Sequence, residues 1–329
     1  MKLVTYTDPS TLESRSGLYT ADGVVDIHRA LARHFAEEDP AGAEELAQAL
    51  GPTTVLEILR RGRRSRTAIA TLADRLEHDP TFVRRVAETP PHALYPADRV
   101  HLEAPIPRPG KIIHTAGNFR EHAKEGEKAG WEFPMPHWIS FLKSPSAVIG
   151  PYDPIVKPSF TQKLDHEIEV GIVIGRRSKH LTPETAVEAI AGYVVFNDVT
   201  ARDVQREEMK SGLLNFGKNF DTFAVFGPWL VTADSVPDPH NLKMELKVNG
   251  DPRQVSSTRN LAVKIPEIVA HYSWVTLEPG DIISTGTVSG VAAFRTPDPT
   301  PFFLKDGDLV ETEVESLGQQ RNRVVEAER

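Results

Sequence analysis

Apolar and polar positions along the first hundred residues predict a small β unit followed by helices. Residues 2–6 predict a strand, and Ala21-Asp22-Gly23 predicts a hairpin turn between two apolar pairs. Apolar residues at helical spacing then predict helices over residues 27–35, 41–50 and 54–76, which are rich in Ala, Leu, Glu and Arg. We find no catalytic cluster in this part of the sequence.

Prolines mark the end of this first part. They stand at residues 90, 91, 96, 105, 107 and 109, and such a stretch is typical of a stiff connection. We therefore predict a boundary near residue 100, between an N-terminal α/β domain (1–100) and a second domain (101–329). A chain of 329 residues has room for one large domain and a smaller one.

Beyond residue 110 the pattern changes to short strands separated by turns. The predicted strands cover residues 111–115, 141–143, 163–174, 191–196, 229–231, 243–248, 281–285 and 309–314. Asn249-Gly250 predicts a type I′ hairpin, and Pro266 predicts the first turn of a helix ending near residue 274. Strands and long helices do not alternate, which disfavours a doubly wound parallel sheet. We predict an α+β fold with a mixed, mostly β core.

The predicted strand over residues 163–174 carries acids inside an apolar sequence. Glu167 and Glu169 are two residues apart, so their side chains point to the same face, about 6 to 7 Å apart. Two like charges in a partly dry setting raise each other's pKa unless a cation neutralises them. A hard divalent ion such as Mg²⁺, Mn²⁺ or Ca²⁺ meets that need with oxygen ligands. The alternative is a solvated strand face with Glu at alternate positions.

A third acid follows another apolar strand. Asp198 comes directly after residues 194–196, where the chain turns into a polar, helical pattern, so it is either a ligand at a strand end or a helix N-cap. Arg202 and Gln205 lie four and seven residues further on and would share a helical face with Asp198. They could hold a carboxylate and a developing oxyanion. The alternative is an exposed helix face.

Two further groups are candidates for acid–base and charge chemistry. His122 and Glu125 are three residues apart, so a helical turn would let the carboxylate orient the imidazole as a general base. The alternative for this pair is a surface helix with ordinary charge pairs. Lys218 and Lys143 follow aromatic residues, where a lysine is either partly desolvated and a useful donor or extended to water.

Composition and missing motifs narrow the classes of function. The net charge of -8 argues against nucleic acid as a partner, and the arginines of residues 60–66 fit a solvated helix face. Cysteine is absent, which removes disulfides, thiolate nucleophiles and sulfur-ligated zinc. No apolar run approaches the ~20 residues of a membrane span, and we expect a cytoplasmic protein. Gly-x-Ser-x-Gly and the Gly-rich nucleotide loops are missing.

Several segments, taken in order, resemble the fumarylacetoacetate hydrolase family over roughly residues 105–315. The strongest are Gly-Asn-Phe-Arg-Glu-His-Ala-Lys-Glu at 117–125, Asp-His-Glu-Ile-Glu-Val at 165–170, and Gly-Tyr-Val-Val-Phe-Asn-Asp-Val-Thr-Ala-Arg-Asp-Val-Gln at 192–205. Gly-Lys-Asn-Phe-Asp-Thr-Phe, Val-Asn-Gly, Leu-Glu-Pro-Gly-Asp and Thr-Gly-Thr follow at 217–223, 248–250, 277–281 and 285–287. No single segment is specific, but the combination is.

The resemblance implies a role for each candidate residue. Three carboxylates would carry a divalent ion, usually Mg²⁺ or Mn²⁺: Glu167, Glu169 and Asp198. A dyad would activate water: His122 and Glu125. The groups that would bind substrate or stabilise an enolate are Lys218, Arg202, Gln205, Lys143 and Thr287. Three carboxylates leave open positions on a six-coordinate ion, enough for a bidentate 2-oxo acid or 1,3-diketone.

Three positions depart from the family pattern. Phe119 stands where many relatives have Tyr, and Val288-Ser289 replaces the proline-containing form of bacterial members. Thr115 occupies the place of a further metal-binding Asp in fumarylacetoacetate hydrolase itself, which favours three carboxylates over four. Residues 131–138 are aromatic and proline-rich. They are candidates either to cap the site or to pack between domains or subunits.

The implied activity is metal-dependent hydrolysis of the C–C bond of an acylpyruvate or related β-diketone through an enolate. A decarboxylase or isomerase of 2-oxo diacids in aromatic catabolism is the alternative on the same scaffold. A non-catalytic ligand-binding relative is the alternative of another class. The presence of both His122 and Glu125 favours hydrolysis, because the dyad can deliver water. A homodimer is expected from the resemblance alone.

Overall fold

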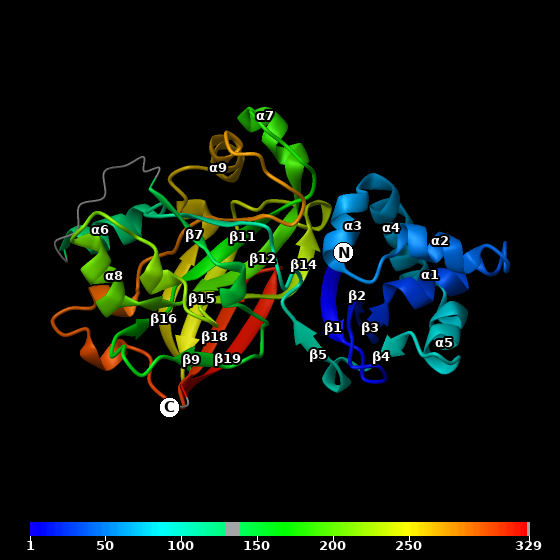
Figure 1. The fold of residues 1–329 in the computed structure, drawn as a ribbon, viewed down its shortest axis with the longest axis horizontal. Coiled ribbons are helices and arrows are strands. Elements are labelled where there is room, and N and C mark those ends of the chain that lie inside the picture. The colour runs from blue at the N-terminus through cyan, green and yellow to red at the C-terminus, as the bar shows by residue number, and fades with distance from the viewer. Residues whose placement is uncertain (129–138, 328–329) are drawn as a thin grey trace.

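The N-terminal part of the chain is a small antiparallel sheet covered by helices. The structure, a computed structural model, describes residues 1–128 and 139–327. It begins with the strands β1 (Lys2–Thr7), β2 (Ser14–Thr20) and β3 (Gly23–Asp26). The helices α1 (Ile27–Phe35), α2 (Ala43–Leu50), α3 (Val55–Arg61), α4 (Arg63–His78) and α5 (Pro80–Glu88) follow and gather at one end of the molecule (Figure 1). The hairpin predicted at residues 21–23 is confirmed, since Thr20 pairs with Gly23.

One predicted helix is divided in two. The single helix expected over residues 54–76 is wrong, because α3 and α4 are separated at Gly62. Gly62 has φ 71° and ψ -138°, a backbone conformation that is essentially restricted to glycine. Both helices bury apolar side chains in the same core, including Ile58 and Ile69. The apolar residues keep their helical spacing on both sides of Gly62. For this reason the spacing alone does not show that the helix is broken there.

A long, mostly antiparallel sheet runs through the whole molecule. Its strand order is β4-β3-β2-β1-β14-β12-β11-β17-β6-β7. The strands not yet introduced are β4 (Leu94–Tyr95), β6 (Ile112–Thr115), β7 (Ser140–Lys143), β11 (Ile168–Ile174), β12 (Ile190–Asp198), β14 (Ala224–Thr232) and β17 (Ile282–Ser284). β5 (His101–Glu103) pairs with β1, and β8 (Val148–Ile149) pairs with β14. Only β17–β6 and β14–β8 are parallel among these pairs of the described chain.

The sheet crosses the predicted domain boundary. Lys2 of β1 pairs with Val231 of β14, so backbone hydrogen bonds join the N-terminal strands to those beyond residue 100. The boundary near residue 100 stays a prediction about independent folding. The α+β class with a sheet-rich core is confirmed.

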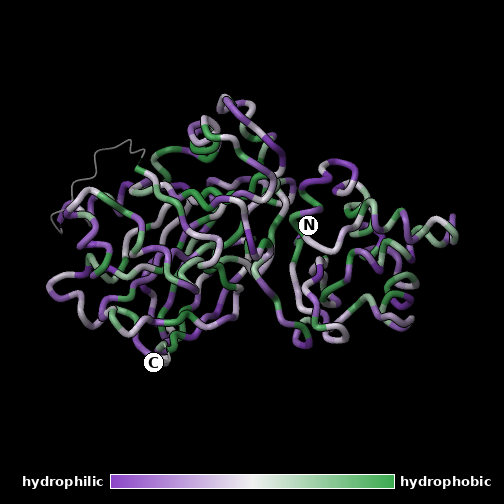
Figure 2. Tube along the Cα trace, in the orientation of Figure 1, coloured by the Kyte–Doolittle hydropathy of each residue, from purple (hydrophilic) through white to green (hydrophobic). Residues whose placement is uncertain are grey.

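A second sheet covers one face of the first. Its order is β16-β15-β18-β19-β9, formed by β9 (Ile155–Lys157), β15 (Lys243–Val248), β16 (Asp251–Ser257), β18 (Leu309–Val314) and β19 (Gly318–Glu326). Val195 and Val225 of the first sheet share a core with Leu246 and Val310 of the second, while Val194 faces the core of the N-terminal helices. Hydrophobic segments occur both among the strands of the two sheets and among the N-terminal helices (Figure 2). Burial on both faces explains the continuous apolar runs of β11 and β12.

The strand expected over residues 163–174 is interrupted just before its acids. The structure has β10 (Leu164–Asp165), paired with β13 (Thr200–Ala201), and then β11 beginning at Ile168. The backbone N–H of His166 donates to Asp165 Oδ1 instead of to a neighbouring strand. This break lets Asp165 and Glu167 turn into the interior at the end of the sheet. The hairpin at Asn249-Gly250 is confirmed, with both residues at positive φ.

Helices outside the N-terminal part are short. They are α6 (Arg120–Lys128), α7 (Pro183–Ala186), α8 (Arg202–Met209) and α9 (Ile265–Tyr272) in the described residues. Within residues 1–128 and 139–327, no helix combines the length and apolar character needed to cross a membrane. The aromatic segment of residues 131–138 lies outside the described residues.

Candidate active site

The predicted acids meet where β11 and β12 lie side by side. These strands are antiparallel, with Ile168 opposite Asn197, so Glu169 of β11 and Asp198 of β12 lie close together. The backbone N–H of Asp198 donates to Glu167 O, and the backbone N–H of Glu167 donates to Asn197 Oδ1, both at 2.9 Å. The three acids are buried, from 0% to 5% exposed. Cross-strand pairing thus brings together residues about 30 positions apart in the chain.

Asp198 is a strand residue and not a helix cap. It is the last residue of β12, whereas α8 begins at Arg202 with Ala201 as its N-cap. Its carboxylate accepts hydrogen bonds from Lys143 Nζ at 2.6 Å and Lys218 Nζ at 2.7 Å. Burial by itself would raise the pKa of Asp198, but the two ammonium groups outweigh it and hold the pKa well below its usual range. Asp198 is therefore charged at neutral pH.

Lys218 bridges two of the predicted ligands. Its ammonium donates to Glu167 Oε2 at 2.8 Å as well as to Asp198. Burial alone would lower the pKa of Lys218, yet the two carboxylates raise it overall. Lys218 also lies over the ring of Phe141, 5.2 Å from its centroid, which favours a cation. The prediction of a desolvated lysine at this position agrees with the geometry.

Lys143 lies behind Asp198. Its side chain is fully buried, and its ammonium donates to Asp198 Oδ1 and to Lys218 O. Burial lowers the pKa of Lys143 despite the neighbouring carboxylate. It does not line the cavity, and its contact with Asp198 holds that carboxylate in place. A substrate-binding role for Lys143 stays a prediction.

Arg202 is held by three partners. Nη2 donates to Glu167 Oε1 at 2.6 Å, Nε to Asp165 Oδ2 at 2.7 Å, and Nη1 to Gln205 Oε1 at 3.0 Å. Arg202 and Gln205 do share one face of α8, but Asp198 does not belong to that helix, so that part of the helical argument was wrong. Asp165 was not singled out from the sequence. Its carboxylate also accepts from the backbone N–H groups of Ala292 and Ala293.

The predicted dyad forms. His122 Nδ1 lies 3.3 Å from Glu125 Oε2, and Glu125 also accepts a hydrogen bond from the Gly290 N–H at 3.0 Å. The imidazole packs against Phe294 with ring centroids 5.3 Å apart. His122 is 7% exposed, so it is a buried member of the site and not part of a surface charge pair.

The hydroxyl of Thr287 is hydrogen-bonded to two neighbouring segments of the chain. Its hydroxyl donates to Ile168 O and accepts from Gln254 Nε2, each at 2.9 Å. Donation to a substrate carboxylate would cost the bond to Ile168. Gln254 belongs to β16, so it links the second sheet to this edge of the site, and its role has no local sequence signal.

One cavity brings most of the predicted residues together. It is lined by these predicted residues: His122, Glu167, Glu169, Arg202, Gln205, Lys218 and Thr287. Its apolar lining comes from Phe141, Met209, Leu214 and Phe294. A small ligand in this cavity would touch acids, cations and the dyad at once.

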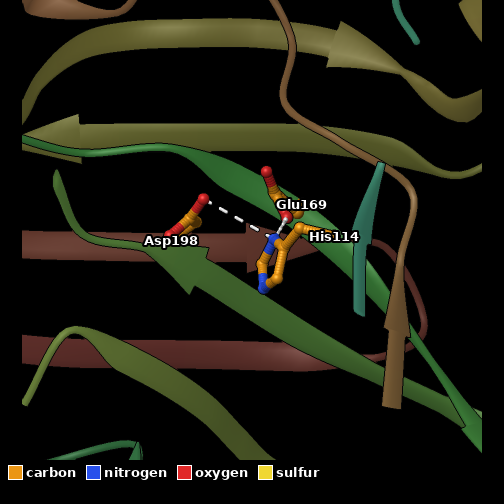
Figure 3. A group of neighbouring side chains, drawn as sticks. All are labelled: His114, Glu169 and Asp198. Atoms are coloured by element: carbon orange, nitrogen blue, oxygen red, sulfur yellow. Dashed lines mark ion pairs between the residues drawn. The ribbon is translucent and has the colours of Figure 1, made fainter. Parts of the chain in front are cut away.

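Glu169 has an additional neighbour that sequence reasoning missed. His114 in β6 places Nδ1 3.0 Å from Glu169 Oε2 and 3.5 Å from Asp198 Oδ2 (Figure 3). The Ser284 hydroxyl also donates to Glu169. Burial raises the pKa of Glu169 in spite of His114. The signal that could have found His114 is a polar residue ending an apolar strand, next to Ile112 and Ile113.

The donor set fits a divalent ion. In the described part of the chain, His114, Glu169 and Asp198 offer ligand atoms within 4.8 Å of one another. The buried Glu169 carboxylate has no lysine or arginine partner there, and both nitrogens of His114 are buried without a hydrogen bond. A bound cation would compensate the buried carboxylate charge and would give a ring nitrogen of His114 a partner. Both carboxylate oxygens of Glu167, by contrast, accept hydrogen bonds, one from Arg202 and one from Lys218. Its role as a metal ligand therefore stays a prediction.

Comparison with known proteins identifies the family of the chain. Residues 111–325 match the family model described as fumarylacetoacetate (FAA) hydrolase C-terminal. The mitochondrial oxaloacetate tautomerase Fahd2a of Rattus norvegicus is 38% identical over 328 residues, which is 99% of this chain and 92% of that protein.

Solved structures agree as well. A fumarylacetoacetate hydrolase from Exiguobacterium antarcticum has a TM-score of 0.74 at 31% identity, covering 99% of this chain and 100% of that one. Maleylpyruvate hydrolase from Sphingobium sp. SYK-6, in complex with manganese(II) and pyruvate, has a TM-score of 0.69 at 31% identity and covers 100% of both chains. The chain belongs to the fumarylacetoacetate hydrolase family.

Proposed function

We propose that this protein is a metal-assisted enzyme that interconverts the keto and enol forms of a small 2-oxo diacid such as oxaloacetate. The observation that carries the proposal is one cavity in which His122, paired with Glu125 behind it, meets a buried cluster of carboxylates, a lysine and an arginine. Tautomerisation needs a base beside an activated carbonyl and no second substrate. The similarity to the rat oxaloacetate tautomerase, which extends over nearly the whole chain, supports this choice over the hydrolysis favoured by the sequence.

The residues of the cavity divide the chemistry among them. Glu125, fixed by the Gly290 N–H, orients the imidazole of His122, which takes the proton from the carbon next to the carbonyl. Lys218 keeps its proton, because its pKa is raised, and so acts as a hydrogen-bond donor to the developing oxyanion. Return of the proton to the oxygen gives the enol, and its return to carbon restores the keto form. No atoms are gained or lost.

Glu169 and Asp198, with Glu167 as the third predicted ligand, are the residues that would hold a divalent ion. When bound, that ion would supply a Lewis acid that polarises the 2-oxo group. Arg202, held between Asp165 and Glu167, brings a guanidinium to the same cavity for the carboxylates of the substrate. Mg²⁺ and Mn²⁺ are both compatible with this proposal, as is Ca²⁺.

The test is a product assay on purified protein with oxaloacetate. We expect faster loss of the enol ultraviolet absorbance than in buffer, and faster exchange of the carbon-bound protons for deuterium, both suppressed by a chelator. No acceleration by metal-loaded protein would contradict the proposal. Release of CO₂ instead would assign decarboxylation.

A single substitution tests the base. His122→Asn should reduce tautomerisation by about 10²- to 10⁴-fold, the usual contribution of general acid–base catalysis. Oxalate, a non-reacting 2-oxo acid analogue, should still bind. The matched control is His78→Asn, which changes an exposed histidine of α4 that pairs with Asp74. Retention of wild-type turnover in His122→Asn would remove the dyad from the mechanism.

Hydrolysis of an acylpyruvate is the second candidate. The His122–Glu125 pair is suited to activate water, and the similar Sphingobium protein is named as a maleylpyruvate hydrolase. A new carboxylic acid formed stoichiometrically with pyruvate, at a rate exceeding tautomerisation of oxaloacetate, would favour this candidate. Glu125→Gln should then abolish hydrolysis.

A further inference from the structure

His114 stands outside the set of residues predicted from the sequence, yet it faces the two acids of the candidate metal site. It lies in β6, between β17 and β7 in the sheet, so backbone pairing on both sides fixes its position. The ring is 1% exposed. It stacks on Phe141 with centroids 4.8 Å apart and meets Phe196 edge-on at 5.0 Å. The imidazole therefore has little freedom to turn away from Glu169 and Asp198.

Its approach to the acids is close but not directed as in a hydrogen bond. Nδ1 lies 3.0 Å from Glu169 Oε2 and 3.5 Å from Asp198 Oδ2 (Figure 3). Within the described residues, neither ring nitrogen makes a hydrogen bond of acceptable direction. An imidazole nitrogen buried without a directed partner is costly unless something else uses it.

The spacing is that of neighbouring ligands on one ion. With metal–ligand bonds of about 2.1 Å at right angles, adjacent ligand atoms stand about 3 Å apart. The two distances from Nδ1 lie at and just above that value. Of the four carboxylates in this cluster, Glu169 is the one without a lysine or arginine partner among the described residues. The carboxylate that lacks a compensating cation is therefore the one next to the imidazole.

We propose that His114 is a nitrogen ligand of the divalent ion, together with Glu169 and Asp198, and that it biases the site toward Mn²⁺ over Mg²⁺. The inference rests on the metal-assisted function proposed above. A nitrogen donor binds a first-row transition ion such as Mn²⁺ more tightly than it binds Mg²⁺ or Ca²⁺, which are hard cations that take oxygen ligands. The ligand set thus becomes mixed nitrogen and oxygen, where the sequence predicted three carboxylates.

Pulsed electron paramagnetic resonance of the Mn²⁺-loaded protein tests the bond directly. We expect a nitrogen coupling to Mn²⁺ in the wild type that changes when histidine is labelled with ¹⁵N. The coupling should persist in His122→Asn, which changes the histidine that lines the cavity, and disappear in His114→Asn. Bound Mn²⁺ without histidine coupling, or coupling that survives in His114→Asn, would overturn the proposal. The labelled wild type gives this answer even if the variant does not fold.

Metal competition supplies a readout independent of spectroscopy and turnover. His114→Asn should weaken Mn²⁺ binding by about 10- to 100-fold, and Mg²⁺ binding by much less. His114→Asp should move the preference toward Mg²⁺. Equal loss for both ions would contradict the proposed bias.

The experiments distinguish failure of the whole metal site from failure of the His114 proposal alone. If the wild type binds neither ion and Glu169→Gln changes nothing, both the metal assistance and the role of His114 are wrong. If Glu169→Gln removes Mn²⁺ binding but no histidine coupling is seen, only the His114 proposal fails.

Discussion

At the residue scale, the site is a buried arrangement of opposite charges in which every group depends on its neighbours. Asp198 stays charged because Lys143 and Lys218 lie against it, and Lys218 stays charged because Glu167 faces it as well. Burial taken alone would neutralise each of them. Substitution of a single member therefore leaves an uncompensated charge, which costs more than the loss of one contact.

Asp165 is the residue in this network whose effect is best separated from catalysis. It holds Arg202 from one side and the backbone of Ala292 and Ala293 from the other. Asp165→Asn should misplace the guanidinium and lower kcat/KM for the 2-oxo acid by about 10- to 100-fold. The measurement is steady-state kinetics, and we expect KM to change more than kcat because Arg202 is the proposed partner of the substrate carboxylate.

The control for Asp165→Asn is Asp203→Asn, on the first turn of α8. The Asp203 carboxylate accepts hydrogen bonds from the Thr161 hydroxyl and the Gln162 N–H, and within the described residues it makes no ion pair with the neighbouring Arg202 guanidinium. Equal kinetic loss in both variants would mean that the effect of Asp165→Asn is general destabilisation of this region and not positioning of Arg202.

At the element scale, the functional side chains lie at the ends of strands and in the turns that follow them. The interruption between β10 and β11 turns Asp165 and Glu167 inward, and the end of β12 supplies Asp198. The turn after β17 carries Thr287, and Gly290 beyond it fixes Glu125. The site is thus assembled from strand ends, where backbone direction changes but the flanking strands stay rigid.

The joint between α3 and α4 gives a prediction about stability. Gly62→Ala should destabilise the protein by about 1 to 3 kcal/mol, because its backbone conformation strains any residue with a Cβ atom. No neighbouring atom would clash with the added methyl, so strain is the cause. Chemical denaturation measures the effect.

Arg64→Ala is the control for that measurement, since it changes an exposed residue on the next turn. We expect a change within about 0.5 kcal/mol for this control. A Gly62→Ala protein as stable as the wild type would show that the junction can adopt another conformation.

The ion pair between Asp8, which follows β1, and Arg29 of α1 predicts that the folded state loses stability at acid pH. Asp8 accepts hydrogen bonds from Ser10 and pairs with Arg29 Nη2 at 2.6 Å. Burial opposes ionisation, but these partners hold the pKa of Asp8 below its ordinary value of 3.8. A lowered pKa in the folded state means that the unfolded chain takes up the proton first. The stabilisation is therefore complete above about pH 4 and is lost as pH falls further.

Unfolding free energies measured at neutral pH and at acid pH test this. Asp8→Asn should reduce the loss of stability below about pH 4, whereas Asp22→Asn in the exposed hairpin should leave the pH profile unchanged. An identical profile for Asp8→Asn and the wild type would refute the contribution of Asp8.

At the scale of the whole molecule, one sheet connects the N-terminal helices to the site, and the net charge is -8. An acidic protein that binds an acidic substrate needs a local excess of positive charge. The cluster's acids, Asp165, Glu167, Glu169 and Asp198, outnumber its cations, Lys143, Arg202 and Lys218, by one. A divalent ion would reverse that sign, so we expect metal to bind before the 2-oxo diacid.

Metal binding should also stabilise the folded chain. A ligand that binds only the folded state adds about 2.7 kcal/mol when its concentration is a hundred times Kd. We expect Mn²⁺ or Mg²⁺ to raise the Tm of the wild type and a chelator to reverse the change. Glu169→Gln should abolish the response. An equal rise in Glu169→Gln would place the ion elsewhere.

The sequence by itself determined the family, the α+β class and seven of the residues that line the cavity. Those features have local causes: apolar runs for buried strands, a Glu-x-Glu pair on one strand face, and a His and Glu three residues apart on a helical turn.

Only the tertiary structure decided how these residues combine. Asp198 is a strand residue because β12 pairs through to its end with β14, and Lys143 is a support because β7 runs behind that acid. His114 and Asp165 become partners of Glu169 and Arg202 across 55 and 37 positions of the sequence respectively. Such contacts depend on strand order and register, which no local pattern of residues encodes.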